Sequence, residues 1–394
     1  MAVGPPRSSN ALPCGKEMDS PASPRVSGFA GTSAQFGAVY RILDGAVAAR
    51  AFPGCAFGVF AGGQVVLQDA IGRFTYDDDA PEVTPATVYD VASLTKVAAT
   101  TAMAMLLHQR GQIDLETPLG RLLPGFLEGR GPRDPGNRVT LRHLLAHNSG
   151  LPGVVEFFKT ATTPDSLFQS CLQLPLEAEP GARVEYSDPG FILLGKALDV
   201  VAAENHGEWV RREIFAPIGM PQTAFRPARE QTGSSIPPTE VDLTFRHRRI
   251  QGEVQDENAW VIGGTAGHAG LFSSVPDLLR LAGEILKAGG NCGAGAGASS
   301  LFERRTIDVF AMRQPPKGSS RAIGWDTPSE NSMSGRRFSQ HSIGHLGFSG
   351  CSLWIDLEAG IAVVLLSNRT WPDRKSRFIR RVWPEFHDAI REAL

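Results

Sequence analysis

The stretch SIGHLGFSGCSLWIDLEAGIAVVLLSNR, from Ser342 to Arg369, decides the fold of this chain. Three runs rich in apolar and β-branched residues are separated by short glycine-containing turns, a pattern that predicts three consecutive strands. Near the other end of the chain, GCAFGVFAGGQVVLQDAIG (Gly54–Gly72) predicts two more strands joined by a turn at Gly62 and Gly63. Strands at both ends favour one sheet that is assembled from both ends of the chain.

Helical patterns fill most of the sequence between these strands. Apolar residues recur at helical spacing in residues 36–51 and again in 273–286, where Ser274 stands at a capping position. The run from 93 to 111 predicts a further, largely apolar helix. The chain closes with a basic helix that we expect Pro384 to interrupt. The fold class is therefore α+β, with a mostly helical region inserted as a subdomain.

Length and composition set limits on domains and location. The 394 residues are consistent with a flexible leader over residues 1–35, rich in Pro, Ser and Gly, followed by one domain over 36–394. We expect its sheet to come from about 36–92 and 300–394, and its helical region from about 93–299. The leader lacks the charged start and apolar stretch of a signal peptide, and no apolar run reaches the roughly 18 residues of a membrane span. These features predict a cytoplasmic protein.

Charge and cysteine content exclude several partners. The chain carries 39 basic and 41 acidic residues, a formal net charge of -2. No strong field would attract nucleic acid or a membrane surface, so neither is expected as a partner. The five cysteines are widely spaced and form no C-x-x-C pair, which argues against a disulfide framework and a zinc site. The sequence does not indicate an oligomeric state.

The segment DVASLTKVAAT (Asp90–Thr100) carries a serine and a lysine that share one face of the predicted helix. Ser93 stands at the helix start, where unpaired backbone N–H groups favour the oxyanion that forms when a serine attacks a carbonyl. Lys96 can hold the proton network of that hydroxyl, or act as a base if burial lowers its pKa. Among the serines of the chain, only Ser93 has a lysine three residues later. This is the chemistry of the S-x-x-K motif.

Two more motifs follow in order. VEYSDPGFILLG places Tyr186 and Asp188 just before a helical run, and GHLGFSG places His345 and Gly347 on a predicted strand. With Ser93 and Lys96, the chain resembles the serine β-lactamase and penicillin-binding-protein superfamily, in particular its class C-like branch with related esterases and D-amino-acid peptidases. That superfamily uses S-x-x-K, then Y-x-N, then K-T-G or H-x-G. The stretches LRHLLAHNSGLPG and GGTAGHAGLFSSVPDLLRLA also resemble this branch. The resemblance covers about residues 36–394 and implies an antiparallel sheet flanked by helices.

The resemblance also implies roles for these residues. Ser93 would be the nucleophile, Lys96 its activating partner, and Tyr186 the proton shuttle between nucleophile and leaving group. The backbone N–H groups of Ser93 and Phe348 would form the oxyanion hole, with Gly347 beside it and His345 lining the pocket opposite. The reaction would be acyl transfer through a serine ester to water, on a small-molecule ester or amide, without a metal or organic cofactor.

Departures from the superfamily pattern narrow the substrate. Asp188 stands where an asparagine is usual, and a carboxylate cannot donate a hydrogen bond to a substrate carbonyl. Near Lys96 it would favour the ammonium and leave proton transfer to Tyr186; alternatively it caps the next helix. His345-Leu346 replaces the lysine and threonine that help to hold a carboxylate. We therefore expect small uncharged esters as substrates, with weak or no β-lactamase activity. The alternatives are a D-amino-acid or muramyl-peptide amidase or peptidase, and a penicillin-binding sensor that does not turn over.

Several other residues invite a functional interpretation. His268 lies in a glycine-rich stretch, which we interpret as a structural loop. Asp256 is interpreted as part of a solvated turn. Trp325 could line the pocket or anchor a loop. His143 and His147 are four apart, but no third ligand accompanies them, so no metal site is expected. The absence of G-x-S-x-G argues against an α/β-hydrolase.

Overall fold

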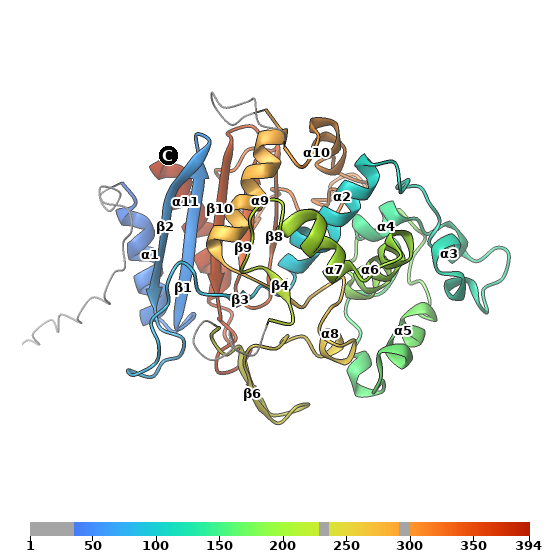
Figure 1. Cartoon of the computed structure of the whole chain (residues 1–394), viewed down its shortest axis with the longest axis horizontal. Helices are drawn as coiled ribbons and strands as arrows, with labels where there is room; N and C mark the ends of the chain where they lie inside the picture. The colour runs from blue at the N-terminus through green and yellow to red at the C-terminus, as the bar shows by residue number, and fades with distance from the viewer. Residues whose placement is uncertain (1–34, 228–235, 291–299) are drawn as a thin grey trace, which may run out of the picture.

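The computed structural model describes residues 35–227, 236–290 and 300–394, so the predicted leader lies outside the described residues except for its last position. A five-stranded antiparallel sheet in the order β2-β1-β10-β9-β8 forms its centre. The first and last strands of the chain are neighbours in this sheet, as predicted (Figure 1). Its strands are β1 (Gly54–Ala61), β2 (Gln64–Gly72), β8 (Ser342–Leu346), β9 (Ser352–Asp356) and β10 (Ile361–Ser367).

Helices cover both faces of the sheet and fill the region inserted between β2 and β8. Among the described residues the helices are α1 (Gly37–Ala48), α2 (Ala102–Gln109), α3 (Leu119–Leu122), α4 (Leu141–Leu145), α5 (Pro164–Leu172), α6 (Asp188–Ala202), α7 (His206–Val210), α8 (Glu257–Val261), α9 (Val275–Ala288), α10 (Arg304–Phe310) and α11 (Ile379–Ala393). Two π-helical turns, η1 (Lys96–Thr101) and η5 (Arg211–Phe215), precede α2 and follow α7. Short 3₁₀ turns lie at η2 (Pro124–Leu127), η3 (Pro135–Arg138) and η4 (Phe157–Lys159).

The inserted region also holds two small sheets that the sequence analysis did not predict. One has the order β3-β7-β4, from β3 (Tyr89–Asp90), β7 (Leu271–Ser273) and β4 (Ala224–Phe225). The other pairs β5 (Glu240–Asp242) with β6 (Arg248–Ile250). All these strands have two or three residues, too few for a period-2 pattern to be visible in the sequence.

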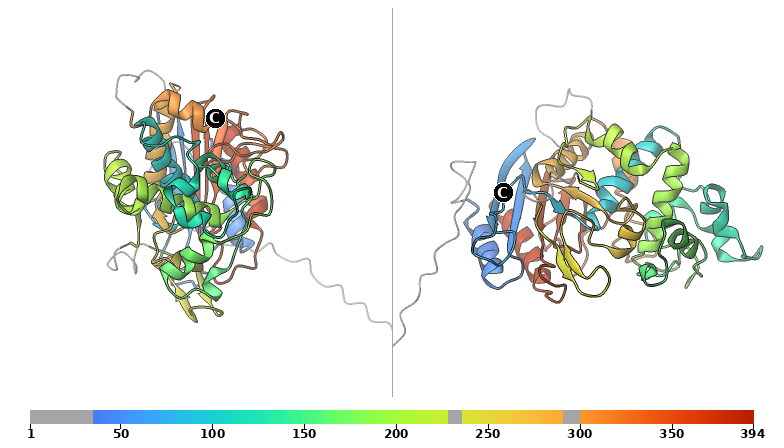
Figure 2. Two further views of the ribbon diagram at one scale, coloured as in Figure 1. Left: turned by 90° about the vertical axis from the view of Figure 1, so that its right-hand side faces the viewer. Right: turned by 60° about the horizontal axis from the view of Figure 1, so that its bottom comes forward.

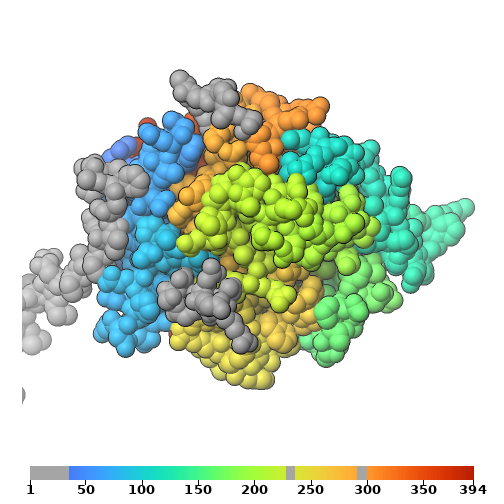
Figure 3. Space-filling view, viewed as in Figure 1, coloured from blue at the N-terminus to red at the C-terminus, as the bar shows by residue number. Residues whose placement is uncertain are grey.

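The sheet separates two hydrophobic cores. On one face α1 and α11 pack together over β1, β9 and β10, and this core contains Phe57, Trp354 and Phe386. On the other face α9 lies against β1 and β10, and the core extends from there into the helical region (Figures 1 and 2). Figure 3 shows the segment around α7 spread over the middle of one side, where it packs on η1 and α2.

Two predicted helix features differ in the structure. The closing helix α11 runs through Pro384 without a break, because Trp383, Phe386 and Ile390 of its buried face hold both halves against the sheet. Ser274 occupies the cap position of α9, but its hydroxyl makes no capping hydrogen bond. Both differences are cases in which tertiary packing outweighs a local signal. Of the helices in the described residues, none has the length and apolar character that crossing a membrane requires.

Candidate active site

A tight turn after β3 presents Ser93. Ala92, just before it, has a left-handed φ of 46°, a conformation that costs energy for a residue with a side chain. The buried carboxylate of Asp90 holds this turn, because its oxygens accept hydrogen bonds from the backbone N–H groups of Ala92 at 2.8 Å and of Gln255 at 2.7 Å. The helix begins at Leu94, so the serine hydroxyl is half-buried at the helix start, as predicted.

Lys96 is completely buried, and all three protons of its ammonium group have acceptors. Its Nζ donates to Ser93 Oγ at 3.1 Å, to Asp188 Oδ1 at 2.7 Å and to the carbonyl oxygen of His268 at 3.0 Å. Burial by itself lowers the pKa of Lys96, but the charge of Asp188 and the interaction with Tyr186 outweigh it, and the net pKa is raised. The lysine is therefore an ammonium at neutral pH, and it contacts the serine oxygen directly.

Asp188 reaches Lys96 because it is the first residue of α6. The N-cap of this helix is Ser187, whose hydroxyl accepts from the N–H of Gly190 at 3.0 Å. Asp188 is therefore free of capping and points its carboxylate at the lysine. Its position in the first turn also places a negative charge at the positive end of the helix dipole. The alternative that Asp188 merely caps the helix is wrong.

Tyr186 lies over the same ammonium group, with its ring centroid 4.8 Å from Lys96 Nζ. Burial raises the pKa of Tyr186, whereas the charge of Lys96 and hydrogen bonding to Lys96 and Ser93 act in the opposite direction. The phenol is thus neutral at neutral pH, beside both the serine and the lysine. The ring of His147 lies against the Tyr186 ring at 4.6 Å between centroids and fixes it from behind.

The loop after β8 packs directly on the nucleophile turn. Gly347 lies so close to the carbonyl oxygen of Val91 that a Cβ at this position would overlap with it. The hydroxyl of Ser349 donates to the carbonyl of Asp90 at 2.7 Å. The backbone N–H groups of Ser93 and Phe348 donate to no other residue in the described parts of the chain. Both are available to an oxyanion, the arrangement expected of an oxyanion hole.

His345 lines the site on the side of Tyr186, with 5.8 Å between ring centroids. Its Nδ1 donates to the carbonyl of Leu346 at 2.7 Å, so Nε2 carries no proton when the ring is neutral. Burial, reinforced by the charges of Arg321 and Lys96, lowers the pKa of His345 well below its usual value. The histidine is therefore neutral and offers an acceptor, whereas the K-T-G lysine that it replaces would offer a cation.

The structure brings every predicted site residue into one place. Ser93, Lys96, Asp188 and Tyr186 form its centre, and the loop carrying Gly347 and Phe348 adjoins it, with His345 on the wall.

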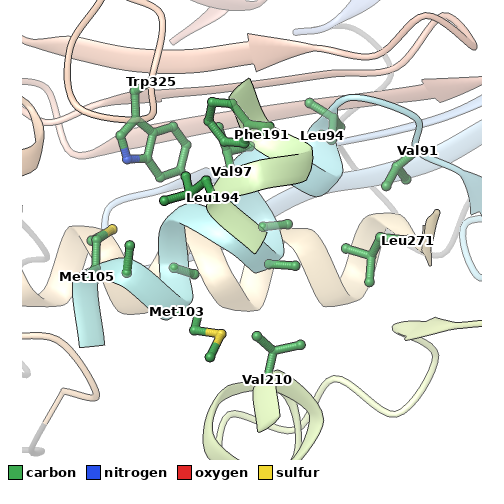
Figure 4. Close-up of a cluster of buried hydrophobic side chains, with 14 of the residues drawn as sticks. Val91, Leu94, Val97, Met103, Met105, Phe191, Leu194, Val210, Leu271 and Trp325 are labelled. Atoms are coloured by element: carbon green, nitrogen blue, oxygen red, sulfur yellow. The ribbon is translucent and has the colours of Figure 1, made fainter. Parts of the chain in front are cut away.

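The other singled-out residues support the site or lie in the core. His268 holds Lys96 through its carbonyl while its ring pairs with Asp256 at 2.9 Å. The carboxylate of Asp256 is thus not merely solvated. Trp325 is buried in the core beside Phe191 and Leu194, so it anchors the interior and does not line the pocket (Figure 4).

Two features of the site were missed by sequence reasoning. His147 was considered only as a metal ligand, but its Nδ1 accepts from the N–H of Ser187 at 3.0 Å and its ring supports Tyr186. The second is a pocket of about 620 Å³ that begins at Tyr186 and His345 and is rich in arginine. A cluster of Glu240, Asp242 and Glu257 has metal-like spacing, but Arg246 pairs with Asp242 and Arg374 pairs with both glutamates, so two arginines already occupy these carboxylates.

Comparison with known proteins agrees with this geometry. A family model described as Beta-lactamase matches residues 39–382. A protein of Salmonella typhimurium named "Putative D-alanyl-D-alanine carboxypeptidase" is 29% identical over 334 residues, which cover 77% of this chain and 76% of that protein.

Solved structures share the fold. EstCE1, described as a hydrolase with promiscuous acyltransferase activity, has a TM-score of 0.71 at 20% identity and covers 91% of this chain and 99% of its own. Simvastatin synthase (LovD) of Aspergillus terreus has a TM-score of 0.67 at 22% identity, over 91% and 98%. The octameric penicillin-binding protein homologue of Pyrococcus abyssi has a TM-score of 0.67 at 22% identity, over 84% and 73%. The fold is therefore that of β-lactamases and transpeptidases, and the chain belongs to the β-lactamase family as one of its serine hydrolases.

Proposed function

We propose that this chain hydrolyses carboxylic esters through an acyl-enzyme formed on Ser93. The observation that carries the proposal is the set of hydrogen bonds from Lys96 to Ser93, Asp188 and the His268 carbonyl. A lysine held in this way stays an ammonium and stabilises negative charge that develops on the serine oxygen. Proton transfer then falls to Tyr186, whose raised pKa keeps the phenol neutral between steps.

In acylation, Ser93 Oγ attacks the ester carbonyl carbon, and the carbonyl oxygen becomes an oxyanion that accepts from the N–H groups of Ser93 and Phe348. Tyr186 takes the serine proton while it gives its own proton to the leaving oxygen, so the carbon–oxygen bond breaks and an alcohol departs. Water then replaces the alcohol: Tyr186 takes a proton from water and returns one to Ser93 Oγ. The products are a carboxylic acid and the free serine, and no metal or organic cofactor takes part.

Two observations support an ester as the substrate. His345 is neutral, so the position of the K-T-G lysine supplies no charge for a carboxylate. The similar fold of EstCE1 belongs to a protein described as a hydrolase with acyltransferase activity. Esters are also chemically easier to cleave than amides, because an alkoxide is a better leaving group than an amide nitrogen.

A D-alanyl peptidase is the second candidate. The name of the Salmonella typhimurium relative favours it, and the arginine-rich pocket beside Tyr186 could receive the carboxylate of a peptide end. The same proton shuttle would serve an amide leaving group. A protein that is acylated by penicillin without turnover is the third alternative, since acylation needs the same residues.

The test is intact mass spectrometry of the protein during turnover of p-nitrophenyl acetate, with benzylpenicillin and a D-alanyl-D-alanine peptide in parallel. We expect a transient acetyl adduct and release of nitrophenol, both absent in Ser93→Ala. A long-lived penicillin adduct without ester turnover would favour the sensor, and peptide cleavage without ester cleavage would favour the peptidase. Ester hydrolysis that persists at full rate in Ser93→Ala would contradict the proposal.

A further inference from the structure

The pocket beside Tyr186 is lined by a group of arginines that the proposed reaction does not use. It has a volume of about 620 Å³ and is bounded by Tyr186 and His345 on the side of the reacting serine. Its far side comes from the segment between β10 and α11 and from the first turn of α11. The arginines on its wall are Arg321, Arg369, Arg374, Arg377 and Arg380.

One of these arginines is already neutralised and the others are not. Arg374 pairs with Glu240 at 2.5 Å and with Glu257 at 2.8 Å. Arg321 has only a distant carboxylate, Asp326, at 3.9 Å. In the described parts of the chain, no carboxylate lies within ion-pair distance of Arg369, Arg377 or Arg380. The lining of the pocket therefore carries an excess of positive charge even after Asp326 is counted.

Arg369 is the strongest sign that an anion belongs here. Arg369 is only 7% exposed. Its guanidinium nevertheless donates only to backbone carbonyl oxygens, those of Phe348 at 2.7 Å and of Ser376 at 3.0 Å among them. Burial lowers the pKa of Arg369 to about 10, and the positive charges of Arg374, Arg380 and Arg377 act in the same direction. A buried cation without a counter-ion is costly, and an anion in the pocket would remove that cost.

The pocket is also coupled to the reacting atoms. The guanidinium of Arg321 lies 5.2 Å from the ring centroid of Tyr186. Arg369 holds the carbonyl of Phe348 and stacks on its ring at 4.3 Å, and the N–H of Phe348 is one donor of the proposed oxyanion hole. In the proposed reaction Tyr186 gives its proton to the leaving oxygen, and Tyr186 lines this pocket, so the leaving group would lie toward the pocket. The half-exposed ring of Phe348 supplies an apolar wall for the uncharged part of that group.

We propose that the leaving group of the natural ester carries two negative charges, which Arg321, Arg369, Arg377 and Arg380 bind in this pocket. The inference rests on the proposed function and names its substrate class. A single carboxylate would leave most of these arginines unpaired, whereas the two charges of a phosphate monoester or a dicarboxylate can engage more of them at once. This proposal departs from the expectation of an uncharged substrate, which considered only the residue types at positions 345 and 346 and not the arginines that the fold brings beside them.

The experiment compares kcat/KM for four acetate esters: phenyl acetate, 4-acetoxybenzoate, 4-acetoxyphenyl phosphate and 5-acetoxyisophthalate. They place zero, one, two and two negative charges on the leaving group, and the last two separate phosphate from dicarboxylate. The variant is Arg377→Gln/Arg380→Gln. We expect the ratio of kcat/KM for a doubly charged ester to that for phenyl acetate to fall about 100-fold in the variant, about tenfold for each lost charged hydrogen bond. Comparing this ratio between the variant and the wild type cancels the intrinsic reactivity of the esters.

The matched control is Arg381→Gln, because Arg381 follows Arg380 in the chain and is exposed like Arg377 and Arg380, but it is paired with Glu385 and does not line the pocket. Its ratio should equal that of the wild type. An equal ratio in the double variant and the wild type would overturn the substrate class, as would a preference for the singly charged ester over both doubly charged ones.

A binding measurement distinguishes failure of the proposed function from failure of the proposed substrate class. Calorimetric titration of Ser93→Ala with 4-hydroxyphenyl phosphate measures the pocket without any acyl transfer. If no ester acylates Ser93, the proposed function fails, but the phosphate should still bind Ser93→Ala at least tenfold more tightly than Ser93→Ala/Arg377→Gln/Arg380→Gln. Equal binding to both proteins would contradict the anion site itself.

Discussion

At the scale of single residues, the charge on Lys96 determines how the proton moves. A buried lysine without a partner would have a low pKa and could act as a base. Here the carboxylate of Asp188 at 2.7 Å reverses that effect, and the net pKa is raised. In the proposed mechanism, Asp188 in place of the usual asparagine keeps Lys96 as an ammonium and leaves proton transfer to Tyr186.

Asp188→Asn tests this assignment. Loss of the carboxylate leaves burial as the main influence on Lys96, so its pKa falls and the ammonium is lost at lower pH. We expect the alkaline limb of the pH profile of kcat/KM to move to lower pH by about one unit or more. Asp308→Asn, which removes an exposed ion pair on α10, is the control and should leave the profile in place. A variant that gains activity as the pH rises would instead make Lys96 the base.

The same pair has a defined effect on stability. The folded-state pKa of Lys96 lies above the unfolded value, so the stabilising contribution is fully present below the unfolded pKa. It is lost only as the pH rises through the folded-state pKa. This lysine therefore adds no pH dependence to the stability near neutral pH, and any pH dependence on the acid side must come from other groups.

At the scale of elements, α11 supplies such a group. His387 lies in this helix, fully buried; its Nδ1 donates to the carbonyl of Met333 at 2.8 Å and its Nε2 accepts from Ser352 of β9 at 3.1 Å. Burial lowers the pKa of His387 to about 4, although the bond to Met333 raises it in part. The neutral ring thus joins α11 to the sheet, and protonation of Nε2 would place a charge in this buried position and reverse the hydrogen bond to Ser352.

Stability should therefore fall when the solution is acidified. Below the ordinary histidine pKa the unfolded chain binds a proton that folded His387 does not, so stability is lost from about pH 6.5 towards pH 4. The loss from this residue amounts to about 3 kcal/mol at the acid end. Urea unfolding between pH 4.5 and 7.5 should show a slope smaller by one proton in His387→Gln. Substitution of the exposed His341 by Gln should leave the slope unchanged, and an unaltered slope in His387→Gln would refute the assignment.

Local patterns predicted the long elements and the motif residues, and they could not predict what depends on contacts between distant segments. The strands at 54–72 and 342–367 were visible because apolar runs end at glycine turns, and the helix start at Ser93 because a polar residue precedes an apolar run. The left-handed Ala92 was not visible, since it depends on Asp90 receiving the N–H of Gln255 from a remote loop.

At the scale of the whole molecule, the arginine pocket shows the same limit more clearly. Arg377 and Arg380 belong to a basic segment that reads as a solvated helix end, and Arg321 belongs to a loop. The strand order brings these arginines together. The segment that follows β10 lies beside the end of β8 that contains His345, and both line the same pocket. The substrate expectation drawn from two motif positions did not take these arginines into account.

The strand order also brings the two ends of the described domain together, and this permits a test of the fold. The side chain of Gln35 donates to the carbonyl of Ala393 at 2.8 Å, and α1 packs along α11 (Figure 1). A circular permutant can therefore begin at Arg133 and end at Pro132. A short Gly-Ser linker would join Leu394 to Gln35, and every strand would stay intact. Its new ends lie in an exposed loop between η2 and η3. We expect it to fold and to hydrolyse p-nitrophenyl acetate within about tenfold of the unpermuted chain 35–394.

Opening the chain between Val363 and Val364 is the contrasting case. This point lies inside β10, which pairs with β1 on one side and β9 on the other, so both halves of the sheet lose register there. We expect no cooperative unfolding transition and no hydrolysis from that permutant. If both permutants folded and were equally active, continuity of β10 would not hold the two ends of the chain in one sheet. If only the surface permutant folded and was active, the sheet would be shown to depend on an unbroken β10 and not on where the chain begins.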